Sequence, residues 1–142
     1  MSKKYVSDIF VTVDIVVLRE IMGQKEILLI QRKNDPFRNH WALPGGFVDK
    51  DEDIETAAKR ELKEETCVDV EKIEQVKTYG NPYRDPRGYM VSVAYFTEVA
   101  SDTKAQAADD ARALQWFAVE NLPELAFDHQ LIIEDTLAKV YS

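Results

Sequence analysis

Apolar and polar positions along this 142-residue chain predict several strands and two helices. Positions 8–18 are rich in β-branched residues, which predicts a strand, and 26–31 predicts its neighbour after a turn near Gly23. Further strand patterns lie at 41–48, 68–79, 89–99 and 114–119. Residues 54–65 have helical periodicity, and a second helix is expected from Asp128, as its N-cap, to the C-terminus.

Polar stretches at 32–40, 80–88 and 100–110 separate these elements, and each is expected to be a loop. The last helix is expected to face the core with an apolar stripe made of Ile133, Leu137, Val140 and Tyr141. No internal repeat, low-complexity linker or change of composition divides the chain. One domain spanning 1–142 is therefore expected, of the α/β or α+β class, with enough length for a hydrophobic core.

Composition is that of a soluble globular protein, with 45% hydrophobic and 31% charged residues. No apolar run of about 18 residues predicts a membrane span, and the N-terminus lacks the pattern of a signal peptide. A single cysteine excludes an internal disulfide, which fits a cytoplasmic location. The net charge is −8, and residues 49–71 contribute −6 of it, which disfavours binding to nucleic-acid phosphates.

Residues 54–65 predict a helix that is capped by Asp51 or Asp53 and contains neither Gly nor Pro. At about 100° per residue, its apolar stripe consists of Ile54, Ala57, Ala58 and Leu62. The same projection places three carboxylates within this stripe or at its edge, namely Glu61, Glu64 and Glu65.

Carboxylates on the apolar side of a helix require a counter-charge. Residues three and four apart are neighbours on a helix, so these three glutamates repel one another, and burying them unpaired is costly. A bound divalent cation resolves the conflict, because Mg²⁺ prefers oxygen ligands. A solvated acidic face is the alternative, but the position of the acids, after Gly45 and Gly46 and on the apolar side, favours the metal site.

The segment 45–68 resembles the Nudix box, G-x5-E-x7-R-E-U-x-E-E-x-G-U, where U is aliphatic. Eight positions match, namely Gly46, Glu52, Arg60, Glu61, Leu62, Glu64, Glu65 and Val68. Cys67 departs from the pattern, because it occupies the position of the late glycine, where a left-handed C-cap is common. Eight residues at this spacing are far more specific than a lone glycine motif.

The resemblance implies an α/β/α sandwich around a mixed sheet, and the predicted elements follow that order over nearly the whole chain. It also implies Mg²⁺ or Mn²⁺ bound by the backbone carbonyl of Gly45 and by Glu61, Glu64 and Glu65. Such an ion neutralises phosphate oxygens and activates a water that attacks phosphorus. Arg60 and Glu52 are expected to orient this site by ion pairing.

The sequence leaves the general base open. Nudix members use either a glutamate of the box or an acid in a loop outside it. Asp109 and Asp110 are the loop candidates here, and Glu98 is a further one. A solvated turn is the competing interpretation of the aspartate pair.

The loop 80–88, GNPYRDPRG, is a candidate for substrate recognition, because two prolines and two glycines fix its shape. Arg84 and Arg87 are expected to contact phosphate, since guanidinium groups bind it in a bidentate manner. Tyr83 is expected to stack on a ring of the substrate. A turn in which Asp85 satisfies the arginines is the competing interpretation.

Four further residues have simpler interpretations. Arg32 is a phosphate candidate, with a surface ion pair as its alternative. His129 and Trp41 are expected to serve in packing, and Cys67 is expected to be a small buried apolar residue.

The stretches WALPGGFVD, RDPRG and AFDH together resemble one branch of the family, the ADP-ribose pyrophosphatases and the Nudix-related regulators of NAD metabolism. This implies Mg²⁺-dependent hydrolysis of ADP-ribose to AMP and ribose 5-phosphate. A pyrophosphohydrolase of oxidised nucleoside triphosphates and a non-catalytic ADP-ribose sensor are the alternatives. The expected ligand is a nucleotide diphosphate, the expected assembly is a homodimer, and neither nucleic acid nor membrane is an expected partner.

Overall fold

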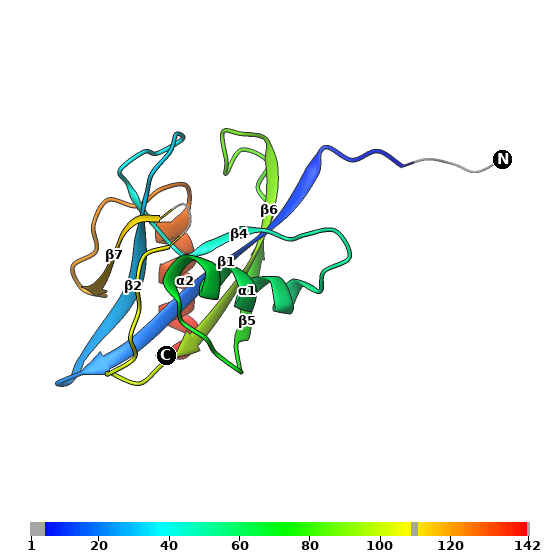
Figure 1. The fold of residues 1–142 in the computed structure, drawn as a ribbon. Helices are drawn as coiled ribbons and strands as arrows, with labels where there is room; N and C mark the ends of the chain where they lie inside the picture. Colours follow the sequence, from blue (N-terminus) through cyan, green and yellow to red (C-terminus); the bar gives the residue numbers. More distant parts are fainter. Residues whose placement is uncertain (1–4, 109–110, 142) are drawn as a thin grey trace.

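The computed structural model describes residues 5–108 and 111–141. They form nine elements, namely β1 (Ile9–Ile21), β2 (Gln24–Arg32), β3 (Trp41–Ala42), β4 (Gly45–Phe47), α1 (Ile54–Thr66), β5 (Glu74–Tyr79), β6 (Tyr89–Glu98), β7 (Ala111–Ala118) and α2 (His129–Val140). The strands join one mixed sheet in the order β3-β2-β1-β6-β5, with β4 also paired to β1 and β7 to β2 (Figure 1). Neither helix of the described part is long and apolar enough to span a membrane.

Strand β1 is the centre of the sheet, parallel to β6 and antiparallel to β2. Its side chains alternate between two cores: Val13 and Ile15 pack with α1, whereas Val16 and Leu18 pack with α2. Figure 1 shows α1 in front of the sheet and α2 behind it. Because both faces are covered, β1 is a nearly continuous apolar run, and the predicted α/β/α sandwich is confirmed.

Several strand boundaries differ from the sequence prediction. β1 and β2 extend beyond 8–18 and 26–31, and the stretch 41–48 divides into β3 and β4. β5 begins at Glu74 instead of position 68, because residues 68–73 pack apolar side chains beneath α1 without a ladder partner. β7 begins at Ala111 instead of position 114, because its pairing with β2 continues across a register shift to Arg32. The apolar residues of these segments therefore predicted which parts of the chain are buried, but they did not predict where backbone pairing with a neighbouring strand begins.

Helix α1 follows the prediction closely. Asp53 is the N-cap and accepts a hydrogen bond from the Thr56 N–H (3.3 Å), whereas Asp51 lies in the preceding turn. Ile54, expected in the apolar stripe, is instead 36% exposed, because it lies beyond the edge of the core. Cys67 has the left-handed conformation (φ 63°) of a C-cap; the expectation of a buried side chain is wrong, because this cap position faces solvent.

Helix α2 differs from the prediction at both ends. Asp128 occupies the N-cap position but makes no side-chain cap, because its carboxylate binds Arg84. The buried side of the helix consists of His129, Ile132, Ile133 and Thr136. Tyr141 lies beyond the last turn and is 38% exposed, so the predicted stripe is correct only in part.

Candidate active site

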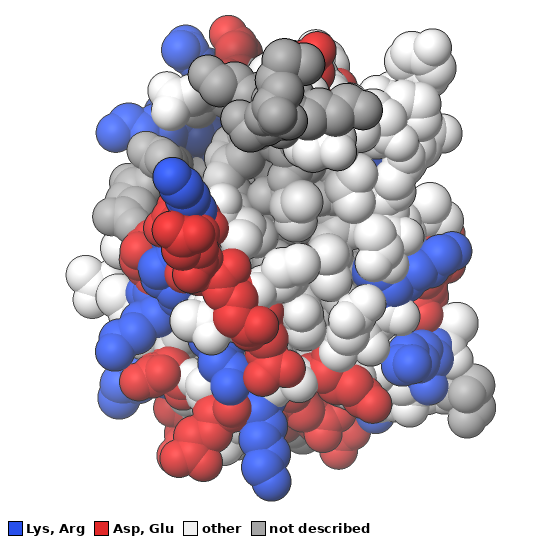
Figure 2. All heavy atoms as spheres, turned by 90° about the vertical axis from the view of Figure 1, so that its right-hand side faces the viewer, with Lys and Arg blue, Asp and Glu red and all other residues white. Residues whose placement is uncertain are grey.

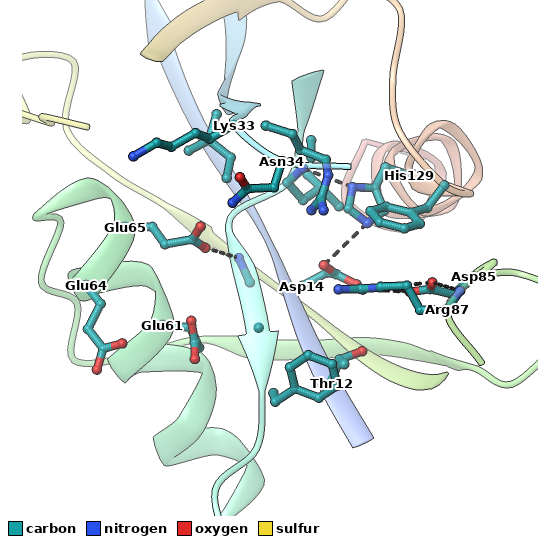
Figure 3. Close-up of a pocket in the computed structure, with 18 of the residues that line it drawn as sticks. Thr12, Asp14, Lys33, Asn34, Glu61, Glu64, Glu65, Asp85, Arg87 and His129 are labelled. Carbon is teal, nitrogen blue, oxygen red and sulfur yellow. Dashed lines mark hydrogen bonds and ion pairs between the residues drawn. The ribbon is translucent and has the colours of Figure 1, made fainter. Parts of the chain in front are cut away.

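A cleft of about 790 Å³ lies between α1 and the loop that joins β5 to β6 (Figure 3). One wall is acidic and carries Asp49, Glu61, Glu64 and Glu65. The opposite wall carries Arg84, Asp85, Arg87, Phe127 and His129. The sheet brings these segments together, because β4, which precedes α1, pairs with β1 between the two walls.

Arg60 organises the acidic wall. Its guanidinium donates to Glu52 through Nε (2.7 Å) and Nη2 (2.9 Å), so the expected ion pair is present. Its Nη1 donates to Glu61 (2.9 Å) and Glu64 (3.1 Å), and Nη2 also donates to the Phe47 carbonyl. Asp49 also lies 3.5 Å from Nη2, so one cation serves four carboxylates and the wall keeps an excess of negative charge.

The pKa values of two carboxyl groups on this wall are shifted in opposite directions. Hydrogen bonds from the Arg60 side chain and the Asp49 backbone lower the pKa of Glu52 to about 2. Burial raises the pKa of Glu61, although the hydrogen bond and charge of Arg60 oppose the shift. Burial thus disfavours the charged form of Glu61, and a divalent cation beside it would favour that form again.

The Gly-Gly turn places backbone directly against these carboxylates. The N–H of Gly45 donates to Oε1 of the buried Glu65 (2.7 Å). A Cβ at Gly46 would collide with the Glu61 carboxylate, and one at Gly45 would collide with the Val13 carbonyl. Glycine is therefore required at Gly45, where the obstacle is backbone, whereas a side chain at Gly46 would displace the Glu61 carboxylate from its position.

The donors on this wall suit a hard divalent cation. Glu61 and Glu64 accept from the same Arg60 nitrogen, so their carboxylates lie side by side, with Glu65 on the same side of α1 (Figure 3). Within residues 5–108 and 111–141, no three Asp, Glu, His or Cys side chains are already closed into a metal cage. Mg²⁺ retains several waters and takes few carboxylates together with phosphate oxygens, so an open carboxylate wall fits it.

The two arginines predicted to contact substrate both line the cleft, and each already has a carboxylate partner. Arg84 donates to Asp128 from Nε (2.9 Å) and Nη2 (2.6 Å), and its side chain is only 4% exposed. Arg87 makes a two-pronged contact with Asp85 (2.7 Å at its shortest) and is 37% exposed. The competing interpretation, in which Asp85 satisfies the arginines, holds for Arg87 but not for Arg84, whose partner is Asp128. Arg87 has the more accessible guanidinium.

A buried polar cluster lies beside Arg84. Asp14 on β1 accepts a hydrogen bond from the Ser92 hydroxyl and lies 3.4 Å from Nε2 of His129 (Figure 3). Nδ1 of His129 accepts the N–H of Leu43 (3.0 Å), which anchors the segment that leads into the Gly-Gly turn. Burial lowers the pKa of His129, and this acceptor role requires the neutral ring.

Arg32 and Tyr83 have contrasting positions. Arg32 lines the cleft, donates to the Pro36 carbonyl (2.8 Å) and lies over the Phe127 ring at 4.9 Å. Tyr83 is 91% exposed and is not among the residues that line the cleft. The structure therefore brings Arg32 into the site but leaves Tyr83 outside it.

The loop candidates for the general base, Asp109 and Asp110, lie outside the described residues. The residue before them, Ala108, donates its N–H to the backbone carbonyl of Glu65 (3.0 Å), which ties this loop to the end of α1. Glu98, the further candidate, lies at the end of β6 and is not part of the cleft lining.

Sequence patterns did not single out Asp14, Phe47 or Phe127, although all three line the cleft. Asp14 had a usable signal, because it is the one charged residue in the apolar run 9–18. The two phenylalanines had none, since an aromatic residue beside a motif cannot be distinguished from a core residue by pattern. His129 is buried as expected, but it also faces the cleft.

Comparison with known proteins identifies the family. The NUDIX domain matches residues 9–137. The ADP-ribose pyrophosphatase of Methanocaldococcus jannaschii is 44% identical over 81% of this chain, which spans 68% of that protein. The ADPR responsive transcriptional repressor NtrR of Acinetobacter baylyi is 39% identical over 91% of this chain, which spans 53% of the repressor.

A solved structure supports the same assignment. The NUDIX domain of Shewanella oneidensis NrtR, crystallised with ADP ribose, has a TM-score of 0.89 and 35% identity, and the match covers 95% of this chain and 90% of that one. The matched region contains the box, the Gly-Gly turn and both walls of the cleft. The chain is therefore a member of the Nudix family.

Proposed function

We propose that this chain hydrolyses the pyrophosphate bond of ADP-ribose, yielding AMP and ribose 5-phosphate, with Mg²⁺ or Mn²⁺ as its cofactor. The observation that carries the proposal is the acidic wall, where one arginine, Arg60, serves Glu52, Glu61 and Glu64. The activity named for the archaeal relative and the ADP ribose in the Shewanella complex support this substrate.

Nudix hydrolases generally use divalent metals. In this chain the ion would be held by the Gly45 carbonyl together with Glu61, Glu64 and Glu65. When bound, it supplies charge neutralisation at the diphosphate and a lowered pKa for water. Arg60 keeps two of these carboxylates in place, in the manner of the groups that orient metal ligands elsewhere.

The reaction is the attack of one water on one phosphorus of the diphosphate, with cleavage of the bond to the bridging oxygen. A base accepts the proton of the water, and the departing phosphate keeps the bridging oxygen. Asp109, Asp110 or a glutamate of the box acts as this base, and the contact of Ala108 with Glu65 supports the loop. A double Asp109→Asn/Asp110→Asn variant with unchanged kcat would remove this loop from the mechanism.

On the opposite wall, Arg87 and Arg32 contact the substrate, because their guanidinium groups lie at the cleft surface. Arg84 acts by holding Asp128 and the loop, since its side chain is nearly fully buried. Tyr83 would join the site only on its outer margin, given its exposure.

A product assay tests the proposal. Purified protein with Mg²⁺ is incubated with ADP-ribose, other nucleoside diphosphate conjugates and nucleoside triphosphates, and the products are separated by anion-exchange chromatography. We expect AMP and ribose 5-phosphate, with ADP-ribose having the highest kcat/KM. Preferred turnover of triphosphates would replace the proposal with a nucleotide-cleansing activity.

A sensor that binds ADP-ribose without cleaving it is the second candidate, because the Acinetobacter relative is a repressor responsive to ADP-ribose. The complete set of Glu61, Glu64 and Glu65 supports the hydrolase instead. Tight binding of ADP-ribose with no AMP formed in the same assay would favour the sensor.

We further propose a cytoplasmic homodimer in which residues 1–142 form one domain that binds neither nucleic acid nor membrane. Tyr5, Val6 and Phe10 support the dimer, since they are 85%, 91% and 50% exposed at the start of the chain. Figure 2 shows a surface of uncharged residues beside a band of acidic side chains, both on the face that is turned to the viewer. Light scattering that finds a monomer throughout the micromolar range would count against the dimer.

A further inference from the structure

Aromatic rings and one guanidinium form a continuous row, of which Phe47, Arg87 and Phe127 line the cleft. The Phe10 and Phe47 rings meet edge to face, with centroids 6.2 Å apart. Arg87 lies between Phe47 and Phe127, with its Cζ 5.5 and 5.3 Å from the two ring centroids. Phe37 then follows, 4.8 Å from Phe127. Rows of planar groups of this kind are suited to stacking a flat ring.

Only part of this row has a face open to a ligand. Phe127 is surrounded by Phe37 (4.8 Å), His129 (5.4 Å) and the guanidinium of Arg32 (4.9 Å). Phe47, in contrast, is 41% exposed and lines the cleft. Phe10 is 50% exposed but does not line the cleft, so Phe47 is the exposed ring of the row that a ligand in the cleft can reach, and Phe127 supports the row from within.

Phe47 and Arg87 are also held in fixed positions. Phe47 directly follows Gly46 and pairs with Thr12 across the sheet, while Arg87 is fixed by its two-pronged contact with Asp85. We propose that Phe47 and Arg87 form a base subsite, on which the nucleobase of the substrate stacks. This inference rests on the proposed function, because it assigns the adenine of ADP-ribose to one end of the cleft.

The subsite fixes the direction in which the substrate lies. Thr12, which pairs with Phe47, marks the subsite end of the cleft. Figure 3 shows Thr12 at one end of the view and Lys33 and Asn34 at the other, with Glu61 and Glu65 between them. The diphosphate then lies along the carboxylates, and the ribose 5-phosphate half extends toward Lys33 and Asn34. An amine and an amide suit hydroxyl and phosphate groups, whereas a base needs an open ring.

Product inhibition separates the two ends, because AMP and ribose 5-phosphate are the two halves of the substrate. Phe47→Leu is expected to raise KM for ADP-ribose and Ki for AMP by about fivefold to a hundredfold, the range for one base–aromatic stack. Its Ki for ribose 5-phosphate is expected to stay unchanged. Lys33→Ala is expected to show the reverse pattern. Tyr141→Leu is the control, since Tyr141 is 38% exposed under the Lys25 amine and is not a cleft residue.

A second variant, Phe47→Trp, allows AMP binding to be measured without turnover, and it does not depend on whether Phe47→Leu folds. Phe47→Trp retains a flat ring, so KM should stay near the wild-type value, and AMP should quench its fluorescence beyond the wild-type change that arises from Trp41 and Trp116. AMP binding by calorimetry is compared across the same variants. If wild type binds AMP through Phe47 but does not cleave ADP-ribose, the proposed function fails and the subsite stands.

Three results would overturn the subsite. One is an unchanged Ki for AMP in a folded Phe47→Leu protein, and another is a rise in Ki for ribose 5-phosphate instead. The third is a loss of AMP affinity in Tyr83→Leu with none in Phe47→Leu, which would move the stack to the outer loop.

Discussion

The two walls of the cleft contain similar charged groups but balance them in opposite ways. On the acidic wall, one arginine, Arg60, serves Glu52, Glu61 and Glu64 and also lies 3.5 Å from Asp49. On the opposite wall Arg84 is paired with Asp128 and Arg87 with Asp85. The first wall therefore gains most from an added cation, whereas the second is already neutralised and rigid.

The two walls therefore have different functions in the site. A wall with excess negative charge binds metal, because the ion relieves the repulsion between carboxylates that Arg60 holds side by side. A wall with matched pairs holds its guanidinium groups in fixed directions before substrate binds, which lowers the entropic cost of binding. Substitutions on the two walls should accordingly affect different quantities.

The largest effect is expected on the acidic wall. Glu61→Gln and Glu64→Gln should each lower kcat and kcat/KM together by at least about a hundredfold, because a metal ligand acts mainly in the transition state. Glu55→Gln is the control, since Glu55 lies on the same helix, 53% exposed and paired with Lys59. Wild-type kcat in both ligand variants would remove these glutamates from the mechanism.

A smaller loss is expected from Arg60→Lys. An ammonium cannot reproduce the fork that holds Glu52 through two nitrogens and Glu61 through a third, so the ligands lose their orientation. The expected fall in kcat is about tenfold to a hundredfold, with a weaker apparent Mg²⁺ affinity in the same assay. Full activity with unchanged Mg²⁺ dependence would show that the charge of residue 60 suffices without its geometry.

The opposite wall should separate stability from binding. Arg84→Ala leaves Asp128 and Asp14 without their cation, so the free energy of unfolding should fall by about 3 kcal/mol. Arg87→Ala should instead raise KM for ADP-ribose about fivefold to a hundredfold, because it removes the guanidinium half of the base subsite. Urea melts and steady-state kinetics measure both quantities, and unchanged KM in both variants would remove this loop from substrate binding.

The smallest effect concerns pH. Burial lowers the pKa of His129 in the folded state, so the unfolded chain takes up its proton first as the pH falls. Stability from this residue is complete above the unfolded pKa of about 6.5 and declines as the pH drops toward the folded value. His129→Gln should flatten the slope of unfolding free energy between about pH 7 and 5.

The sequence predicted the acidic wall better than the opposite one, because the two depend on different kinds of information. The box lies within one helix and one turn, so its spacing alone places Glu61, Glu64 and Glu65 on one side of α1. The pairing of Arg84 with Asp128 joins residues 44 positions apart, which no local spacing encodes.

The same physical reason explains the errors. Asp128 was expected to cap α2, but a bidentate charge-assisted contact with Arg84 is stronger than a cap hydrogen bond, so the carboxylate turns away from the helix. Asp14 is marked in the sequence only as a lone charge in an apolar run, and its partner His129 cannot be inferred from local spacing, because the sheet and α2 bring the two within 3.4 Å. Contacts between residues far apart in the sequence thus determined the side-chain partners that local patterns could not predict.

The most direct test of the central claim is a metal titration followed by thermal unfolding and by turnover of ADP-ribose. Millimolar Mg²⁺ or Mn²⁺ should raise the melting temperature of the wild-type protein, because a ligand of the native state stabilises it. Glu65→Gln should lose most of that increase, and chelator should abolish AMP formation. A melting temperature that ignores both ions, with activity that persists in chelator, would contradict the account.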